Sequence, residues 1–185
     1  MKKLIQIYFI LTSIIVAQQV RVGVRAEYVN VFGFNPSTEV SSGGVSLSLG
    51  FRTSAFGLDF KPSFMVGSYY TGFDYELMSK YYLLSRTSYF ALSFNVHENI
   101  RGGGHTVTSS GLSFVMIGLG YGLEHNDNYT LNVIVYYAPG NNNIGNSYDW
   151  GYNEHGVFTP LYTKYVADVI LEVSAGIDII FGNRY

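Results

Sequence analysis

Apolar and polar residues alternate along most of this chain with a period of two. The clearest case is the last stretch, where every second residue from Tyr165 to Phe181 is apolar and Asp168, Glu172 and Asp178 lie between them. A period of two places successive side chains on opposite faces of a β-strand. The same alternation runs through 20–28, 45–52, 56–67, 90–97, 115–123, 129–137 and 164–181, and more weakly through 75–84. The pattern therefore predicts eight strands, each with one apolar and one polar face.

The connections between these strands alternate in length. Segments 53–55, 85–88 and 124–128 are short and 71–74 is intermediate, whereas 33–43, 98–110 and 138–160 are long. Short turns at one end and long loops at the other are typical of transmembrane antiparallel barrels. We therefore predict an all-β fold, an eight-stranded antiparallel transmembrane up-and-down β-barrel with both chain ends on the short-turn side.

A secreted β-sandwich is the competing interpretation, because its strands also alternate. Two features favour the barrel. The polar faces consist mainly of Gly, Ser and Asn with a few charges, which fits a crowded interior better than a water-exposed sheet. The alternation over 164–181 also exceeds the length of a usual soluble strand, about 5–6 residues. Aromatic residues gather near the strand ends, as in the two girdles of a membrane barrel.

Composition narrows the function classes. Hydrophobic residues make up 48% and charged residues 13% of the 185 residues, with a formal net charge of −2. A nucleic-acid partner is not expected, because binders of nucleic acid carry a basic stripe. The absence of Cys excludes disulfide scaffolds, thiolate catalysis and cysteine-ligated zinc.

The first segment has the features of an export signal. Lys2 and Lys3 precede an apolar run from Leu4 to Val16, and the small residue Ala17 follows. This order is typical of a cleaved signal peptide. The run is too short to cross a bilayer comfortably as a helix, which takes about 20 residues. We predict a signal peptide at 1–17, a barrel at 18–185 and a location in the bacterial outer membrane.

The C-terminus carries a family resemblance. Ser174, Gly176, Ile179 and Phe181 match the polar-x-Gly-x-x-apolar-x-aromatic pattern that the outer-membrane assembly machinery reads on a last strand, although four residues follow Phe181. In size and strand number the mature chain resembles the small eight-stranded outer-membrane proteins of the OmpA, OmpX and OmpW kind. The resemblance is architectural. It implies the assembly machinery and outer-membrane lipid, including lipopolysaccharide, as partners.

The polar faces predict a charged lumen. An eight-stranded barrel is just wide enough for side chains to fill it, and a lone buried charge is costly. Strand closure is expected to bring Arg21 towards Asp178, and Glu27 or Arg25 towards Glu172. These pairs either fill the core or form a gate or narrow pore. The expected set of five basic and five acidic residues is Arg21, Arg25, Glu27, Arg52, Asp59, Lys61, Lys164, Asp168, Glu172 and Asp178, to which Glu76 and Lys80 would add one of each sign.

The segment 138–160 is a candidate recognition loop. It contains Tyr148, the only Trp at position 150, Tyr152 and His155 among many Asn and Gly residues. Rigid aromatic side chains with adaptable hydrogen-bonding groups are typical of recognition surfaces, and stacking on sugars is one use of such rings. The alternative is a polar outer loop whose aromatics rest on lipopolysaccharide or cap the barrel mouth.

Candidate catalytic chemistry is weak. The histidines lack the helical spacing of zinc ligands, and we expect no metal or other cofactor. Ser93 and His97 share a strand face but lie about 13 Å apart, too far for a nucleophile–base pair. His105 with His155, or His155 with Asp149 or Glu154, would have to act from the outer loops. We expect a non-enzymatic protein that acts through extracellular loops in surface binding or envelope integrity. The alternatives are a narrow channel for small solutes and an outer-membrane lipid-modifying enzyme or protease.

Overall fold

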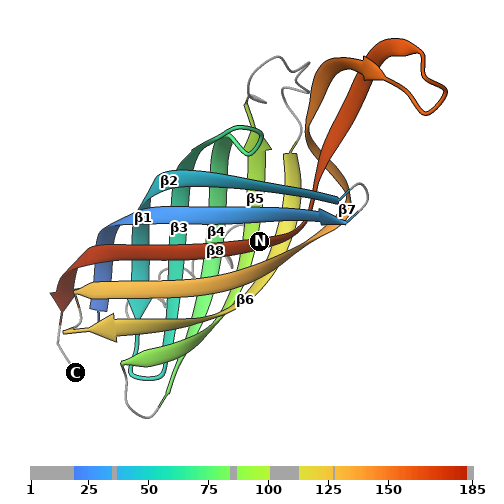
Figure 1. Cartoon of the computed structure of the whole chain (residues 1–185). Helices are drawn as coiled ribbons and strands as arrows, with labels where there is room; N and C mark the ends of the chain where they lie inside the picture. The colour runs from blue at the N-terminus through green and yellow to red at the C-terminus, as the bar shows by residue number, and fades with distance from the viewer. Residues whose placement is uncertain (1–18, 35–36, 84–86, 101–112, 127, 183–185) are drawn as a thin grey trace, which may run out of the picture.

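The computed structural model is a closed eight-stranded antiparallel barrel, which confirms the predicted all-β, up-and-down barrel fold (Figure 1). It describes residues 19–34, 37–83, 87–100, 113–126 and 128–182. Each strand pairs with the next in sequence, and β1 closes the barrel by pairing with β8. The strands are β1 (Gln19–Phe34), β2 (Ser37–Arg52), β3 (Phe56–Gly67), β4 (Gly72–Tyr82), β5 (Ser88–Asn99), β6 (Ser113–His125), β7 (Tyr129–Tyr152) and β8 (Phe158–Gly182).

The two ends of the barrel differ. Gln19 pairs with Gly182, so the described chain begins and ends at the same end as the β2–β3, β4–β5 and β6–β7 connections. We call this the short-turn end. The opposite end carries the β1–β2, β3–β4, β5–β6 and β7–β8 connections, and we call it the hairpin end. The predicted signal peptide and its cleavage at Ala17 lie outside the described residues.

Two segments that were predicted to be long loops are mostly β-strand in the structure. Segment 33–43 is mostly strand, because β1 continues to Phe34 and β2 begins at Ser37. Segment 138–160 is mostly a hairpin, in which residues from Asn142 to Tyr152 pair with residues from Phe158 to Ala167 after register shifts beyond Tyr137. Both segments lose the alternation that marks a strand with unlike faces. The strands continue to pair through their backbones in both segments, however, so the alternation of apolar and polar residues ends before the strands do.

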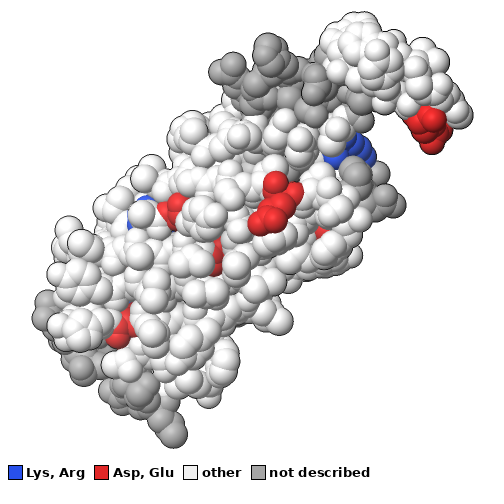
Figure 2. All heavy atoms as spheres, in the orientation of Figure 1, with Lys and Arg blue, Asp and Glu red and all other residues white. Residues whose placement is uncertain are grey.

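The outer face of the barrel is an apolar belt. On β3, Phe56, Phe60, Phe64 and Val66 are exposed, and equivalent rows of exposed apolar residues follow on the neighbouring strands. The row from Phe56 to Val66 rises about 34 Å along the strand. With a tilt of about 40° it covers about 26 Å of barrel height. Figure 2 shows that most of the visible barrel face is uncharged, with a few separate acidic patches.

Glycines make room for the lumen side chains. Arg25 pairs across the sheet with Gly176, Asp178 with Gly23, and Asp59 with Gly50. A Cβ at Gly23 or Gly50 would overlap the facing carboxylate, and one at Gly176 would lie 2.6 Å from the Cγ of Arg25. The same relation holds for Tyr136 opposite Gly118 and Tyr89 opposite Gly122. The Gly-rich polar faces are therefore a packing requirement of a narrow barrel that contains large side chains.

Candidate functional site: the charged lumen and the β7–β8 ribbon

The lumen near the short-turn end contains a cluster of four cations and three carboxylates. The carboxylates are Asp59 from β3, Glu124 from β6 and Asp178 from β8. Arg21 and Arg52 both contact Glu124, with the Arg52 Nη1–Glu124 Oε2 distance at 2.7 Å. We call this set the turn-end cluster. Its members are Arg21, Arg25, Arg52, Lys80, Asp59, Glu124 and Asp178.

The turn-end cluster joins strands across the barrel as well as around it. Arg25 Nη1 lies 3.0 Å from Asp178 Oδ1, and Arg25 Nη2 lies 3.7 Å from Asp59 Oδ2. Lys80 Nζ lies 2.6 Å from the same Asp59 carboxylate. Tyr82 donates its hydroxyl to Glu124 at 2.8 Å, and the Arg52 guanidinium stacks on the Tyr82 ring at 3.9 Å. These ion pairs and the hydrogen bond from Tyr82 hold the buried charges in one arrangement.

The middle of the lumen contains a second cluster with the opposite charge excess. Lys61 Nζ lies 2.8 Å from Glu27, 2.5 Å from Glu76 and 2.5 Å from Glu172. Tyr136 donates its hydroxyl to Glu76 at 2.7 Å, and Ser93 donates to the same carboxylate at 2.5 Å. We call Lys61, Glu27, Glu76 and Glu172 the mid-lumen cluster. One ammonium group serves three carboxylates here, so the cluster depends on Lys61.

A third group lies closer to the hairpin end. His97 Nδ1 lies 2.6 Å from Asp74 Oδ1, and Tyr70 donates its hydroxyl to the same carboxylate at 3.1 Å. The Tyr70 and His97 rings stack with centroids 3.8 Å apart. Apolar side chains are also buried in this part of the lumen, among them Val31, Met65, Phe114 and Ile170. His97 is therefore engaged by Asp74 and Ser93 by Glu76, and the two do not form a catalytic pair.

The clusters fill the lumen. No member of the turn-end or mid-lumen cluster exposes more than 6% of its surface. A sphere the size of water therefore reaches almost none of these side chains. Buried charges in such a space are stable only when paired and hydrogen-bonded.

The structure places most of the predicted lumen residues inside the barrel and two of them outside it. Eight of the ten lie in the two clusters, and Arg21 does contact Asp178 at 3.6 Å. Glu172, however, pairs with Lys61, and Arg25 pairs with Asp178 and Asp59. The eight are Arg21, Arg25, Glu27, Arg52, Asp59, Lys61, Glu172 and Asp178.

The predicted lumen positions of Lys164 and Asp168 need correction. Asp168 lies half-exposed at the barrel rim, where it accepts the backbone N–H of Phe34 at 2.7 Å. Lys164 is half-buried and pairs in register with Asn146, beyond the last β1–β8 pair at Phe32 and Val169. Both residues have the sequence parity of lumen positions. The strand has left the closed barrel at this height, so parity no longer points to a lumen.

Sequence reasoning missed two buried acids. Glu124 was expected in a turn, and Asp74 in the connection before the fourth strand. Glu124 continues the inward series Gly118, Gly120, Gly122 by one step, and this alternation could have identified it. The predicted assembly-signal residues lie on both faces of β8. Ser174 is buried in the lumen and Gly176 faces Arg25, while Ile179 and Phe181 are exposed on the belt.

The second candidate site is the extension of β7 and β8 beyond the barrel. Figure 1 shows this hairpin, in orange, projecting from the barrel. We call residues 142–167 the ribbon. From Asn142 to Tyr152 one of its strands rises about 34 Å. Its base is fixed to the barrel, because Asn99 Nδ2 donates to the Ile144 carbonyl at 2.8 Å and the Tyr69 ring stacks on Tyr165 at 3.8 Å.

The ribbon tip presents aromatic rings to solvent. Trp150, Tyr152 and Phe158 are 55%, 73% and 58% exposed. The Trp150 and Phe158 rings are nearly parallel with centroids 5.8 Å apart, and Tyr152 lies 5.3 Å from Phe158. His155 is also exposed, with its Nε2 3.6 Å from the Glu154 carboxylate. The position of Tyr148 is described only through its backbone pairing with Tyr162.

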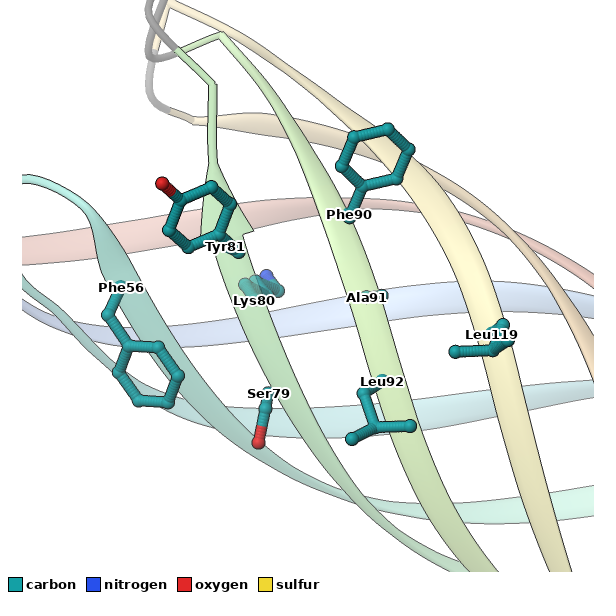
Figure 3. Close-up of a pocket in the computed structure, with 8 residues that line it drawn as sticks. All are labelled: Phe56, Ser79, Lys80, Tyr81, Phe90, Ala91, Leu92 and Leu119. Carbon is teal, nitrogen blue, oxygen red and sulfur yellow. The ribbon is translucent and has the colours of Figure 1, made fainter.

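Hollows also occur on the apolar belt. One of about 240 Å³ is lined by Phe56, Tyr81, Phe90, Leu92 and Leu119 around the small residue Ser79 (Figure 3). A second, of about 290 Å³, surrounds Pro62 on the outer face of β3. Both are almost entirely apolar and face away from the lumen.

Neither a metal site nor a similarity to known proteins points to a function for this chain. Among the described residues, no three His, Asp or Glu side chains are grouped to hold a metal ion, and no helix is long and apolar enough to span a membrane. His105 lies outside the described residues, so its predicted pairing with His155 is not described. No protein-family model matches this chain, and no relative is found among curated proteins.

Proposed function

We propose that this protein is an integral outer-membrane barrel with a closed lumen, which acts through its extracellular hairpins in surface contact. The observation that carries the proposal is the distribution of polarity. The exposed face is an apolar belt about 26 Å high, and the charges are inside. A water-soluble protein rarely exposes so large an apolar surface. Lipid is the solvent that such a surface suits.

The proposed orientation follows from the two ends of the barrel. In outer-membrane barrels the short turns face the periplasm and the longer connections face outward. The ribbon then projects from the cell surface, and both ends of the described chain, Gln19 and Gly182, lie on the periplasmic side. The hollows around Ser79 and Pro62 fall on the lipid-facing belt, where acyl chains would fill them.

Cysteine labelling tests this orientation directly, because the native chain has no Cys. Glu154→Cys places a thiol at the exposed ribbon tip, and Ser54→Cys places one in the exposed β2–β3 turn. We expect a membrane-impermeant maleimide to label Glu154→Cys on intact cells and Ser54→Cys only after permeabilisation. Equal labelling of both variants on intact cells, or recovery of the protein in the soluble fraction, would overturn the proposal.

The competing function is a narrow channel, favoured by the continuous series of ionisable side chains down the lumen. The close pairing and burial of both clusters support a closed lumen instead. We expect the folded protein to be silent in a planar bilayer. Discrete current steps that change in Arg25→Ala or Glu172→Gln would favour the channel and contradict the closed-lumen part of the proposal.

A further inference from the structure

The aromatic side chains at the ribbon tip form one face. Tyr152 pairs directly with Phe158, and Trp150 lies two residues before Tyr152 on the same strand. Side chains two apart on a strand, and those directly opposite on its partner, share a face. Their ring contacts order the three side chains against one another. The face is therefore preformed, and little side-chain entropy remains to be lost on binding. We call Trp150, Tyr152 and Phe158 the aromatic face.

The aromatic face is not needed to complete the barrel. All three side chains are more than half exposed, whereas the ribbon base near Ile144 is fully buried. The ribbon tip lies beyond the last β1–β8 pair. Exposed aromatic rings held rigidly on a projecting element are the usual anchors of recognition surfaces.

The charge of the segment limits the partner. Residues 138–163 contain no Lys or Arg, and their ionisable side chains apart from Tyr are Asp149, Glu154 and His155. Sulfated polysaccharides, nucleic acids and anionic lipid headgroups all require basic side chains. The outer part of the ribbon does not provide them, because its one basic residue, Lys164, lies near the base, where it pairs in register with Asn146.

The polar turn at the tip argues against insertion into a bilayer. Glu154 and His155 are 86% and 77% exposed and lie at the outermost turn, between Tyr152 and Phe158. Driving the rings into hydrocarbon would carry these two side chains with them, and desolvating a carboxylate is costly. The turn is also well defined, because the Asn153 side chain accepts the backbone N–H groups of His155 and Val157 at 3.0 and 2.9 Å.

We propose that the aromatic face binds a neutral polysaccharide, with sugar rings stacked on Trp150 and Phe158 and hydroxyl groups bonded to Glu154 and His155. A pyranose ring presents an apolar C–H face and a rim of hydroxyl groups. The tip offers the matching groups, aromatic faces beside a carboxylate and an imidazole. This proposal deepens the proposed function, because it names the chemical class that the extracellular ribbon contacts.

Trp150 is the only tryptophan of the chain, so its fluorescence reports on the aromatic face alone. The experiment titrates the full-length barrel in detergent micelles, which add no tryptophan, with neutral hexaoses of the gluco, manno, galacto and xylo series. We expect a saturable change in Trp150 fluorescence with at least one of them. Phe158→Ala should weaken that binding at least tenfold. The matched control is Phe34→Ala, an exposed aromatic residue at the same end of the barrel but outside the ribbon, which should leave binding unchanged.

Two results would overturn the proposal. One is the absence of any saturable response to the neutral hexaoses from a barrel shown to be folded. The other is a response confined to anionic polysaccharide or to lipid vesicles, which would assign the rings to another partner. The titration uses isolated protein, so its result is independent of the cysteine labelling that tests the cellular location.

Discussion

The lumen and the ribbon use the same residue types in opposite ways. In the lumen, Tyr136 and Tyr82 are buried, and their hydroxyls serve carboxylates that also bind cations. On the ribbon, Tyr152 and its aromatic neighbours are exposed and contact mainly one another. Buried polar groups are energetically demanding and must be satisfied, whereas exposed rings remain accessible to a partner. We therefore expect mutations in the lumen to change stability and mutations at the ribbon tip to change binding.

Removing the mid-lumen ammonium should give the largest loss of stability. Lys61→Met leaves Glu27, Glu76 and Glu172 without their shared cation. Breaking a buried ion pair by removing one partner typically costs about 3–5 kcal/mol. We expect a loss of that size in the free energy of unfolding, measured by denaturant titration in lipid vesicles.

The control for Lys61→Met is to remove the negative charges that the variant leaves without a cation. Adding Glu27→Gln and Glu172→Gln to that variant removes two of the uncompensated carboxylates, and should recover part of the lost stability. A loss below about 1 kcal/mol in Lys61→Met alone would show that the cluster does not depend on its lysine, since that is the range of exposed pairs.

Two glycines on β2 allow a matched pair of alanine substitutions, whose expected effect on stability is smaller than that of Lys61→Met. A Cβ at Gly50 would overlap the Asp59 carboxylate, whereas one at Gly43 would have only the Glu27 carbonyl oxygen nearby, at 3.8 Å. Overpacking a filled interior typically costs about 1–3 kcal/mol. We expect Gly50→Ala to lose that much stability and Gly43→Ala to lose none. Equal effects in the same unfolding assay would refute the packing role of the glycines.

The sequence predicted the barrel well because lipid and lumen impose unlike faces on each strand. Even the weak segment 75–84 showed the correct parity, with Glu76 and Lys80 on the lumen side. The prediction failed where that contrast disappears. The ribbon has solvent on both faces near its tip, so Asn, Gly and Ser residues looked like a loop although the backbone pairs continue.

Ion-pair partners were harder to predict than faces. The alternation shows that Arg25 and Glu172 point inward. It does not show how high along the barrel axis each side chain lies. The height depends on strand stagger, which places Arg25 beside Asp178 and Asp59 and leaves Glu172 to Lys61. Stagger is a property of the closed barrel and is not encoded in any one strand.

Two ribbon truncations separate the anchored base from the exposed tip. Replacing residues 150–160 with Asn-Gly joins the paired residues Asp149 and Leu161 through a turn that suits a two-residue hairpin. Stability should change by less than about 1 kcal/mol, because the lost side chains are mostly exposed. Deleting 141–157 should cost more, since it removes buried Ile144 and its bond from Asn99. The readout is the temperature at which the band of the folded barrel is lost in electrophoresis. Equal shifts would mean that the base is not an anchor.

The smallest expected effect on stability is that of Phe158→Ala, and it completes the comparison between the two regions. The Phe158 ring is more than half exposed, and its ring contacts are with Trp150 and Tyr152, which are themselves exposed. Surface substitutions of this kind usually lie within about 0.5 kcal/mol of the parent protein. We therefore expect an unchanged denaturant midpoint together with a change in the Trp150 emission spectrum, because the stacked neighbour of the single tryptophan is lost. A marked fall in the midpoint would show that the tip rings stabilise the barrel, and the division between a lumen that sets stability and a ribbon tip that contacts partners would then be wrong.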